Sequence, residues 1–300
     1  KDFFNNQDVV VYDPFEIDKK YFQNIFVSFF NCFQIGIRHG IGNDNFLKNE
    51  KKYKIKNLIY LSHSVTQSKY IKQKFGLKDH YILKSGVIKY SPNWVNKIRK
   101  EKNDFQYKKK FKNSIFLISR HNTNYFIKSD KILILKIIKK KVIDELNQKI
   151  IVKLHPKEDP NSAKKIYYDI FGREEYNKTW CFSKSHSFQI SQLCNFAISF
   201  ISSVSIDLLN FKKPTIEMLN FGKRSNKQNF SFLKNNLVIP SNDTRNFNNI
   251  LLKMIHGKFN CKLLLNNFSK KYYKVDNIKT FKTIYKYHYE YSNNLCKKKF

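Results

Sequence analysis

The chain has 300 residues, of which 41% are hydrophobic, so it is long enough for two domains that each bury a core. Lysine and arginine number 57 against 23 aspartates and glutamates, a formal net charge of +34. This charge favours phosphate-bearing partners, although a blend rich in Lys, Asn, Ile, Phe and Tyr also fits AT-rich codon usage. The five cysteines form no C-x-x-C pair and no apolar run approaches ~20 residues, which argues against a disulfide framework, a zinc site and a membrane span.

The cysteine pattern predicts a reducing compartment, and we expect a cytoplasmic protein. The chain starts at Lys1, has no signal peptide and enters almost directly into a strand, so we expect a fragment that lacks its first part.

Strands and helices alternate along the first third of the chain. Short apolar runs predict strands at residues 8–12, 33–38, 58–61 and 81–84, and helical patterns lie at 21–32 and 66–75. Ser64 is a plausible cap for the second helix and Gly76 would close it. This alternation predicts an α/β fold with a parallel, doubly wound sheet.

Residues 96–112 form a basic run, NKIRKEKNDFQYKKKFK. We interpret it as a solvated helix and linker; the alternative is a patch for an anionic membrane or nucleic acid. We place a domain boundary here, with a first domain at 1–105, a second at 106–245, and C-terminal helices with a basic tail at 246–300.

The alternation resumes after the basic run. Strands are predicted at 114–119, 150–154, 179–182, 195–200 and 214–218, and the main helices at 130–147, 163–171, 205–211, 246–255 and 261–273. Ser129 is a plausible cap of the first of these helices. The basic, aromatic tail is expected to be partly disordered.

Several polar residues stand where a predicted strand ends, namely His39, Ser85, Arg120, His121, His155, Ser202 and Ser203. The carboxyl ends of parallel strands share one edge of a sheet, so within each domain these groups should converge on a ligand crevice.

Ser202 and Ser203 open the predicted helix at 205–211. Its first N–H groups make a ready anion site, and the alternative is plain capping by serine. One serine can cap while its neighbour binds phosphate. Arg120, Lys153 and His155 would add donors to the same phosphates, and Lys153 alternates with His155, which predicts the same side of the strand.

His39 precedes a loop in which Gly40 lets the backbone approach a ligand, and Gly86 stands at a similar strand end. A neutral imidazole suits a general base for a hydroxyl group, and the alternative is a loop histidine bonded to backbone. The chain has no G-x-G-x-x-G, P-loop or G-x-S-x-G motif and no metal-ligand spacing, so we expect no metal or cofactor.

Three motifs together resemble the GT-B glycosyltransferase group: HG at 39–40, KLHP at 153–156 and SFISSVSIDLLNFKKP at 199–214. The chain is similar in particular to the CDP-glycerol glycerophosphotransferases of teichoic acid synthesis and to capsule-polysaccharide transferases. The match includes Asp207. The family has an acidic Asp before its Ser-Ser pair, where this chain has Phe200 and Ile201.

The resemblance implies two Rossmann-like domains facing a cleft, and metal-independent transfer from a nucleotide-activated donor to a polysaccharide or lipid-linked acceptor. His155, Ser202, Ser203 and Asp207 would hold the donor, and His39 would deprotonate the acceptor. Basic surfaces could hold such a cytoplasmic enzyme near the inner face of an anionic membrane, where lipid-linked acceptors reside. The alternatives are a non-hydrolysing sugar-nucleotide 2-epimerase of the same fold, an inactive paralogue, or a basic nucleic-acid-binding protein, which the even spread of basic residues disfavours.

Overall fold

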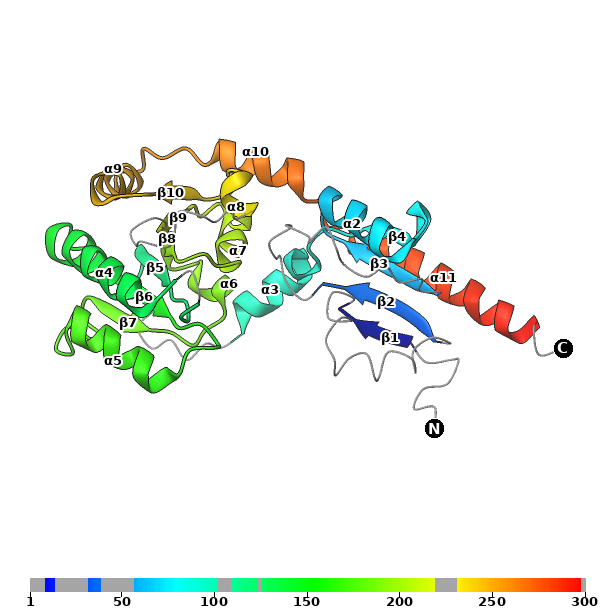
Figure 1. Ribbon diagram of the computed structural model, residues 1–300, viewed down its shortest axis with the longest axis horizontal. Helices are drawn as coiled ribbons and strands as arrows, with labels where there is room; N and C mark the ends of the chain where they lie inside the picture. Colours follow the sequence, from blue (N-terminus) through cyan, green and yellow to red (C-terminus); the bar gives the residue numbers. More distant parts are fainter. Residues whose placement is uncertain are drawn as a thin grey trace. The chain divides into compact units, whose positions relative to one another are not determined.

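The computed structural model describes residues 9–13, 32–38, 57–101, 109–123, 126–218 and 231–297. The chain divides into two compact units, the first made of Lys1–Pro92 with Phe268–Phe300 and the second of Asn93–Asn267. Each unit holds its own parallel sheet with helices packed on it, as Figure 1 shows. The predicted α/β class is therefore confirmed.

The first sheet has the strand order β1-β2-β3-β4. Its strands are β1 (Val9–Tyr12), β2 (Phe33–Ile37), β3 (Leu58–Ser62) and β4 (Ile82–Lys84), and every neighbouring pair is parallel. Short 3₁₀ turns at Asp79–Tyr81 and Ile88–Tyr90 flank β4. Among the described residues, the helices that pack on this sheet are α2 (Val65–Phe75) and α11 (Asn277–Lys297).

Helix α2 begins and ends as the sequence predicts. The Ser64 side chain accepts a hydrogen bond from the Gln67 N–H, and Gly76 closes the helix in the left-handed conformation, with φ of 63°. Its residues Ile71 and Phe75 pack into a core with Tyr60.

Helix α11 contradicts the expectation of a partly disordered tail, since residues 277–297 are helical. The reason is amphipathic spacing: Ile284, Tyr287 and Tyr291 lie three to four residues apart and pack against the first sheet. Burial of this face stabilises a helix whose many lysines made the segment look unstructured.

The second sheet has the strand order β10-β9-β8-β5-β6-β7, and all its pairs are parallel. The strands are β5 (Ser114–Ile118), β6 (Ile150–Lys153), β7 (Trp180–Phe182), β8 (Cys194–Ser199), β9 (Thr215–Met218) and β10 (Ile239–Ser241). The chain runs from β5 outward to β7, returns to β8 beside β5, and then proceeds to the other edge. The strand order thus reverses between β5 and β8, and ligands of open α/β sheets bind at such a point.

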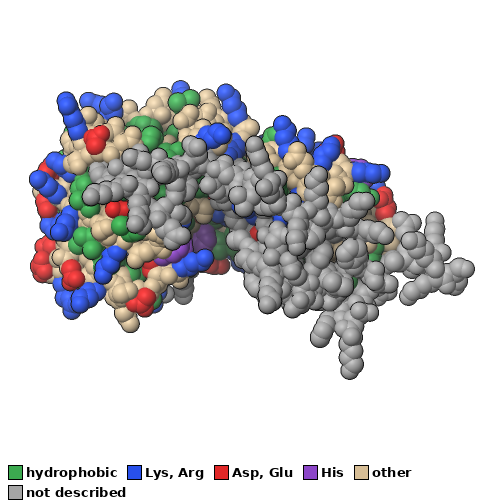
Figure 2. All heavy atoms as spheres, viewed as in Figure 1, with side chains coloured by type: hydrophobic (Ala, Val, Ile, Leu, Met, Phe, Trp, Pro, Cys, Tyr) green, Lys and Arg blue, Asp and Glu red, His purple; other side chains and the backbone are tan. Residues whose placement is uncertain are grey.

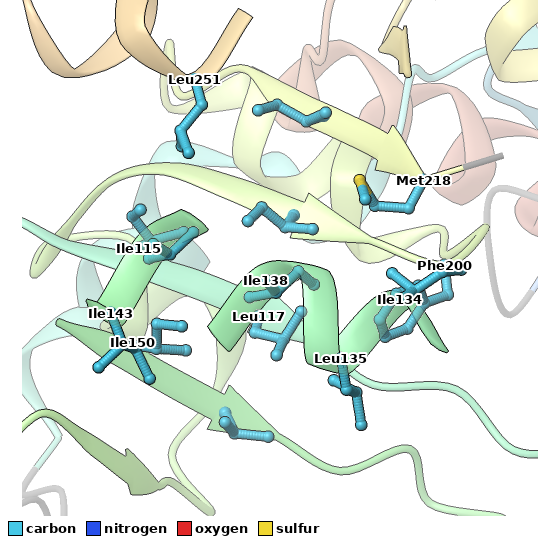
Figure 3. Close-up of a cluster of buried hydrophobic side chains, with 14 of the residues drawn as sticks. Ile115, Leu117, Ile134, Leu135, Ile138, Ile143, Ile150, Phe200, Met218 and Leu251 are labelled. Carbon is cyan, nitrogen blue, oxygen red and sulfur yellow. The ribbon is translucent and has the colours of Figure 1, made fainter. Parts of the chain in front are cut away.

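Helices pack on both faces of the second sheet. The helices of this part of the chain are α3 (Pro92–Lys100), α4 (Lys128–Ile138) with a π-helical continuation (Lys139–Glu145), α5 (Pro160–Phe171), α6 (Ser187–Ile190), α7 (Val204–Asn210), α8 (Ser231–Lys234) and α9 (Thr244–Ile255). Helix α10 (Lys262–Lys271) follows and contains the division between the two units. The main core joins Ile134, Leu135 and Ile138 of α4 to the sheet, as Figure 3 shows. Its packing fixes the strand ends that form the site.

The two units divide the chain at other residues than the predicted domain boundaries. Phe247 and Leu251 of α9 belong to the core of the second sheet, while the segment from Phe268 onward belongs to the first unit. The predicted boundary between residues 105 and 106 itself lies outside the described residues.

The predicted cap at Ser129 is wrong, and three predicted segments cannot be compared with the structure. Ser129 lies inside the first turn of α4 and does not cap it, since the N-cap position is Ile127. The predicted loops at 41–45 and 221–229, and nearly all of the predicted helix at 21–32, lie outside the described residues.

The basic residues do not gather in one place on the visible face of the molecule. Figure 2 shows Lys and Arg side chains scattered among Asp, Glu and neutral groups. Among the described residues, no helix combines the length and the apolar character needed to cross a bilayer.

Candidate functional site

The site lies in the second unit, where β5, β6, β8 and β9 end. Arg120 and His121 follow β5, His155 follows β6, and Ser202 and Ser203 follow β8. Because β6 and β8 both pair with β5, these groups lie along one stretch of the sheet edge. Of these candidates, Arg120, His121 and His155 lie close to one another, while the two serines follow the next strand of the sheet.

His155 is held in one orientation by its neighbours. Its Nδ1 accepts a hydrogen bond from the Lys157 N–H at 3.1 Å, and its own backbone N–H donates to Glu158 Oε2 at 2.7 Å. A ring nitrogen that accepts carries no proton, so the neutral ring has its proton on Nε2. His155 therefore presents an N–H donor.

His121 accompanies His155, with ring centroids 4.5 Å apart. Burial, with smaller contributions from His121 and the positive charge of Arg120, lowers the pKa of His155 to about 4, against an opposing effect of Glu158. Burial and Arg120 likewise lower the pKa of His121. Both rings are neutral at physiological pH, so the positive charge beside them comes from Arg120 and Lys157.

A buried ion pair between Lys131 and Glu158 supports the His155 loop, with side-chain exposures of 3% and 5%. Lys131 Nζ also donates to Ser119 Oγ at 3.0 Å and lies 5.2 Å from the centre of the Tyr167 ring. Burial lowers the pKa of Lys131, and the contact with Glu158 opposes this effect. The pair fixes Glu158, which in turn holds the backbone of His155.

A pocket of about 280 Å³ opens beside this pair, lined by His121, Asn122, Lys131, Lys157, Glu158, Asp159, Ser162, Ala163 and Ile166. Sequence reasoning missed Lys131 and Glu158. Glu158 stands three residues after the His-Pro motif begins, but Lys131 comes from α4, and no local pattern links the two.

The two serines of the Ser202-Ser203 loop differ in their hydrogen bonds, and only one of them caps the helix that follows. Ser202 Oγ accepts a hydrogen bond from the Val204 N–H at 3.3 Å, whereas Ser203 makes no capping bond with its side chain. Ile201, just before them, has φ of 62°, a left-handed conformation that is strained for a β-branched residue.

Glu217 of β9 holds that strained residue, because its Oε1 accepts a hydrogen bond from the Ile201 N–H. Burial raises the pKa of Glu217, and although the bond from Ile201 and the charge of Arg120 oppose this effect, the resulting value is about 8. A carboxyl group therefore does lie at the Ser-Ser loop, but it comes from the neighbouring strand. Sequence reasoning missed it because Glu217 stands inside an otherwise apolar strand.

Two predicted residues have other contacts. Lys153 Nζ donates to the carbonyl oxygens of Lys184, at 3.3 Å, and Ser185, at 2.6 Å, and burial lowers its pKa. Its ammonium group is thus already supplied with acceptors. Asp207 is buried on α7, and Ser187 Oγ lies 3.3 Å from its Oδ2.

The remaining candidates belong to the first unit. His39 and Gly40 lie outside the described residues. Gly86 has φ of 70°, and a Cβ added there would stand 2.5 Å from the carbonyl oxygen of Tyr273. This glycine permits close packing of the segment between α10 and α11.

No cluster of three or more His, Cys, Asp or Glu side chains suited to a metal ion occurs in the described parts of the chain.

Comparisons with known proteins agree on the fold. No family model matches the chain, and no curated protein matches it by sequence. Among solved structures, the wall teichoic acid polymerase TagF has a TM-score of 0.55 at 13% identity, with 88% of this chain and 70% of that chain covered.

Two other solved structures match to the same extent. A TagF variant soaked with CDPG has a TM-score of 0.57 at 13% identity, over 96% of this chain and 73% of that one. A protein from Listeria monocytogenes assigned as a UDP-N-acetylglucosamine 2-epimerase has 0.58 at 8% identity, over 88% and 69%. At these identities the likeness concerns the fold: the chain has the GT-B-like architecture that its motifs predicted.

Proposed function

We propose that the chain is a transferase that moves a glycosyl or glycerophosphoryl group from a nucleotide-activated donor, CDP-glycerol or a CMP- or UDP-sugar. The acceptor would be a cell-surface polysaccharide or a teichoic-acid-like polymer. The observation that supports this proposal is that Arg120, His155 and Ser203 all follow the carboxyl ends of strands at or beside the point where the strand order of the second sheet reverses, the place where open α/β sheets bind nucleotides.

Each side chain has a distinct task in this proposal. Arg120 pairs with the donor phosphates, His155 donates through Nε2–H, and Ser203 offers the hydroxyl that Ser202 does not. These groups stabilise the leaving nucleotide without a metal ion. His39 takes the proton of the acceptor hydroxyl, an assignment that rests on the family resemblance alone.

Isothermal calorimetry with CMP, CDP, UMP, UDP and a short RNA, each at two salt concentrations, tests the proposal. Cytidine selectivity that His155→Ala abolishes would support transfer from a cytidine-linked donor. The matched control is His256→Ala, which removes an exposed histidine of the same unit that lies at the end of α9. This control should bind as the wild type does.

The other outcomes separate the alternatives. Uridine selectivity would favour a UDP-sugar transferase or the 2-epimerase. Binding of RNA alone, lost at high salt, would replace the transferase with a nucleic-acid-binding protein.

A pair of variants tests the division of labour. His155→Ala should weaken nucleotide binding, whereas His39→Ala should leave binding intact and abolish transfer. The reverse pattern would overturn both assignments.

A further inference from the structure

The chain leaves β8 through a residue in an unusual conformation. Ile201 follows the strand with φ of 62°, and only 9% of its surface is exposed. A left-handed backbone is uncommon for residues other than glycine and is an outlier for a β-branched one, so the surrounding structure must hold it in place. Ser202 and Ser203 come next, so the conformation of Ile201 sets the direction in which this Ser-Ser loop (residues 201–203) leaves the sheet.

The side chain of Glu217 supplies that support. Its Oε1 accepts the hydrogen bond from the Ile201 N–H. Glu217 reaches this group because β9 pairs with β8 in a register that sets Glu217 beside Ser199, two residues before Ile201. The residue is 2% exposed, so the bond is shielded from solvent. One side chain of the neighbouring strand thus fixes the start of the Ser-Ser loop.

The surroundings of Glu217 favour a neutral carboxyl group. Its in-register neighbours are Ser199 and Pro240, and neither β8 nor β10 has a charged residue. Helix α7 packs against β9 and contributes Asp207, which is hydrogen-bonded to a serine of α6. Burial raises the pKa of Glu217; the backbone bond, the charge of Arg120 and the Ser199 hydroxyl oppose this effect, and the resulting value is about 8.

We propose that Glu217 is a positioning residue for donor binding: its neutral carboxyl group holds Ile201, and Ile201 sets the Ser-Ser loop for the donor phosphates. The inference rests on the transferase function proposed above and concerns the control of its phosphate site. An ionised carboxylate here would put a negative charge close to the loop that carries Ser203, where it would repel a bound phosphate. The donor therefore binds the neutral state, and its affinity falls as the carboxyl group ionises.

The first test measures the affinity for CDP by calorimetry at pH 7 and pH 9. The phosphates of CDP are already ionised in this range, since the second pKa of a phosphate ester is about 6. The wild type should bind CDP about tenfold more weakly at pH 9, because only about a tenth of the carboxyl groups stay neutral one unit above a pKa of about 8.

Two variants of Glu217 separate positioning from a purely structural role. Glu217→Gln keeps an acceptor for the Ile201 N–H and cannot ionise, so it should bind CDP equally well at both pH values. Glu217→Leu removes the acceptor and should bind about tenfold more weakly than the wild type at pH 7. An acid that only stabilised the fold would leave the affinity of Glu217→Gln with the same pH dependence as that of the wild type.

Controls assign the effect to this contact. Thr215→Val alters a buried hydroxyl on the same strand and should keep the affinity and the pH dependence of the wild type. Burial also lowers the pKa values of Lys131 and Lys153, so a pH dependence that persists in Glu217→Gln would belong to other groups and contradict the proposal. Ile201→Gly added to Glu217→Leu should recover part of the loss, because glycine adopts the left-handed backbone without support. A double variant that binds no better than Glu217→Leu would show that Glu217 does not act through Ile201.

The second test needs no nucleotide. The amide chemical shifts of Ile201, Ser202 and Ser203 in the free protein, measured by NMR from pH 6 to pH 10, should move together with a midpoint of about pH 8. They should stay constant in Glu217→Gln. Constant shifts in the wild type would overturn the proposal whether or not nucleotides bind, and so would moving shifts with CDP binding that is independent of pH. Moving shifts in a protein that binds no nucleotide would support the control of the loop by Glu217 and reject the transferase function instead.

Discussion

Glu217 places a carboxyl group between Ile216 and Met218, in a strand where every residue is buried. A buried charge without full compensation is costly, so the folded protein keeps the proton. The neutral carboxyl group still accepts the bond from Ile201 and adds no negative charge beside the proposed phosphate site.

A pH series on Glu217→Gln tests this state. The folded-state pKa is about 8 and the ordinary value is 4.5, so between these pH values the folded chain holds a proton that the unfolded chain has lost. Wild-type stability contributed by this group therefore falls as pH rises through that window, by about 1.4 kcal/mol per pH unit.

Urea unfolding from pH 5 to 9 measures this effect. The free energy of unfolding of Glu217→Gln should rise relative to that of the wild type up to about pH 8, and the difference should stay constant above that pH. Glu217→Leu, which leaves the Ile201 N–H without an acceptor, should be less stable by about 1–3 kcal/mol. A pH-independent difference between wild type and Glu217→Gln would show that the carboxyl group is ionised throughout.

Lys131 and Glu158 form the other buried polar unit of the site. Lys131→Met should reduce the free energy of unfolding by about 3–5 kcal/mol, because Glu158 would stay buried without its cation. Adding Glu158→Gln to that variant should recover most of the loss. A double-mutant cycle by urea unfolding measures this coupling, and additive effects would contradict it.

At the scale of elements, apolar runs were sufficient to locate strands. Those at 58–61, 114–119 and 150–154 lie within one residue of β3, β5 and β6, since a strand buried on both faces reads as an unbroken hydrophobic run. Helix α11 was missed because its inward residues are diluted by lysines, and only contact with a sheet assembled from distant segments gives them a role.

The sequence predicted the site residues that directly follow strands, but it did not predict those that other elements contribute. His155 and the two serines follow strands, and a strand end is visible in the sequence. Lys131 and Glu217 reach the site from another helix and another strand, so only the tertiary structure places them there.

The turn after β4 depends on Gly86. Gly86→Ala would put a methyl group against the Tyr273 carbonyl and force a left-handed backbone on an alanine. We expect a loss of about 2 kcal/mol or more in stability, measured by thermal unfolding. Gly257→Ala is the matched control, because its φ of 66° carries the same strain but its added Cβ meets nothing within 4 Å. Equal losses in the two variants would exclude the packing contact.

At the scale of the whole molecule, the two units have separate cores. Ile284→Asp on the inner face of α11 should therefore destabilise the first sheet by about 2–4 kcal/mol and leave the second unchanged. Hydrogen exchange of amides in β3 and β5 measures both effects in one sample. Equal loss of protection in the two strands would show that the units unfold together.

The first unit is built from both ends of the chain, and this has a consequence for biosynthesis. The second unit, Asn93–Asn267, is continuous, and all of its residues are synthesised before α11. The nascent first sheet must wait with Phe33, Ile59 and Leu61 uncovered until Ile284, Tyr287 and Tyr291 arrive. The later segment of this polypeptide therefore completes its folding first, and the earlier one depends on chaperones or on a short delay.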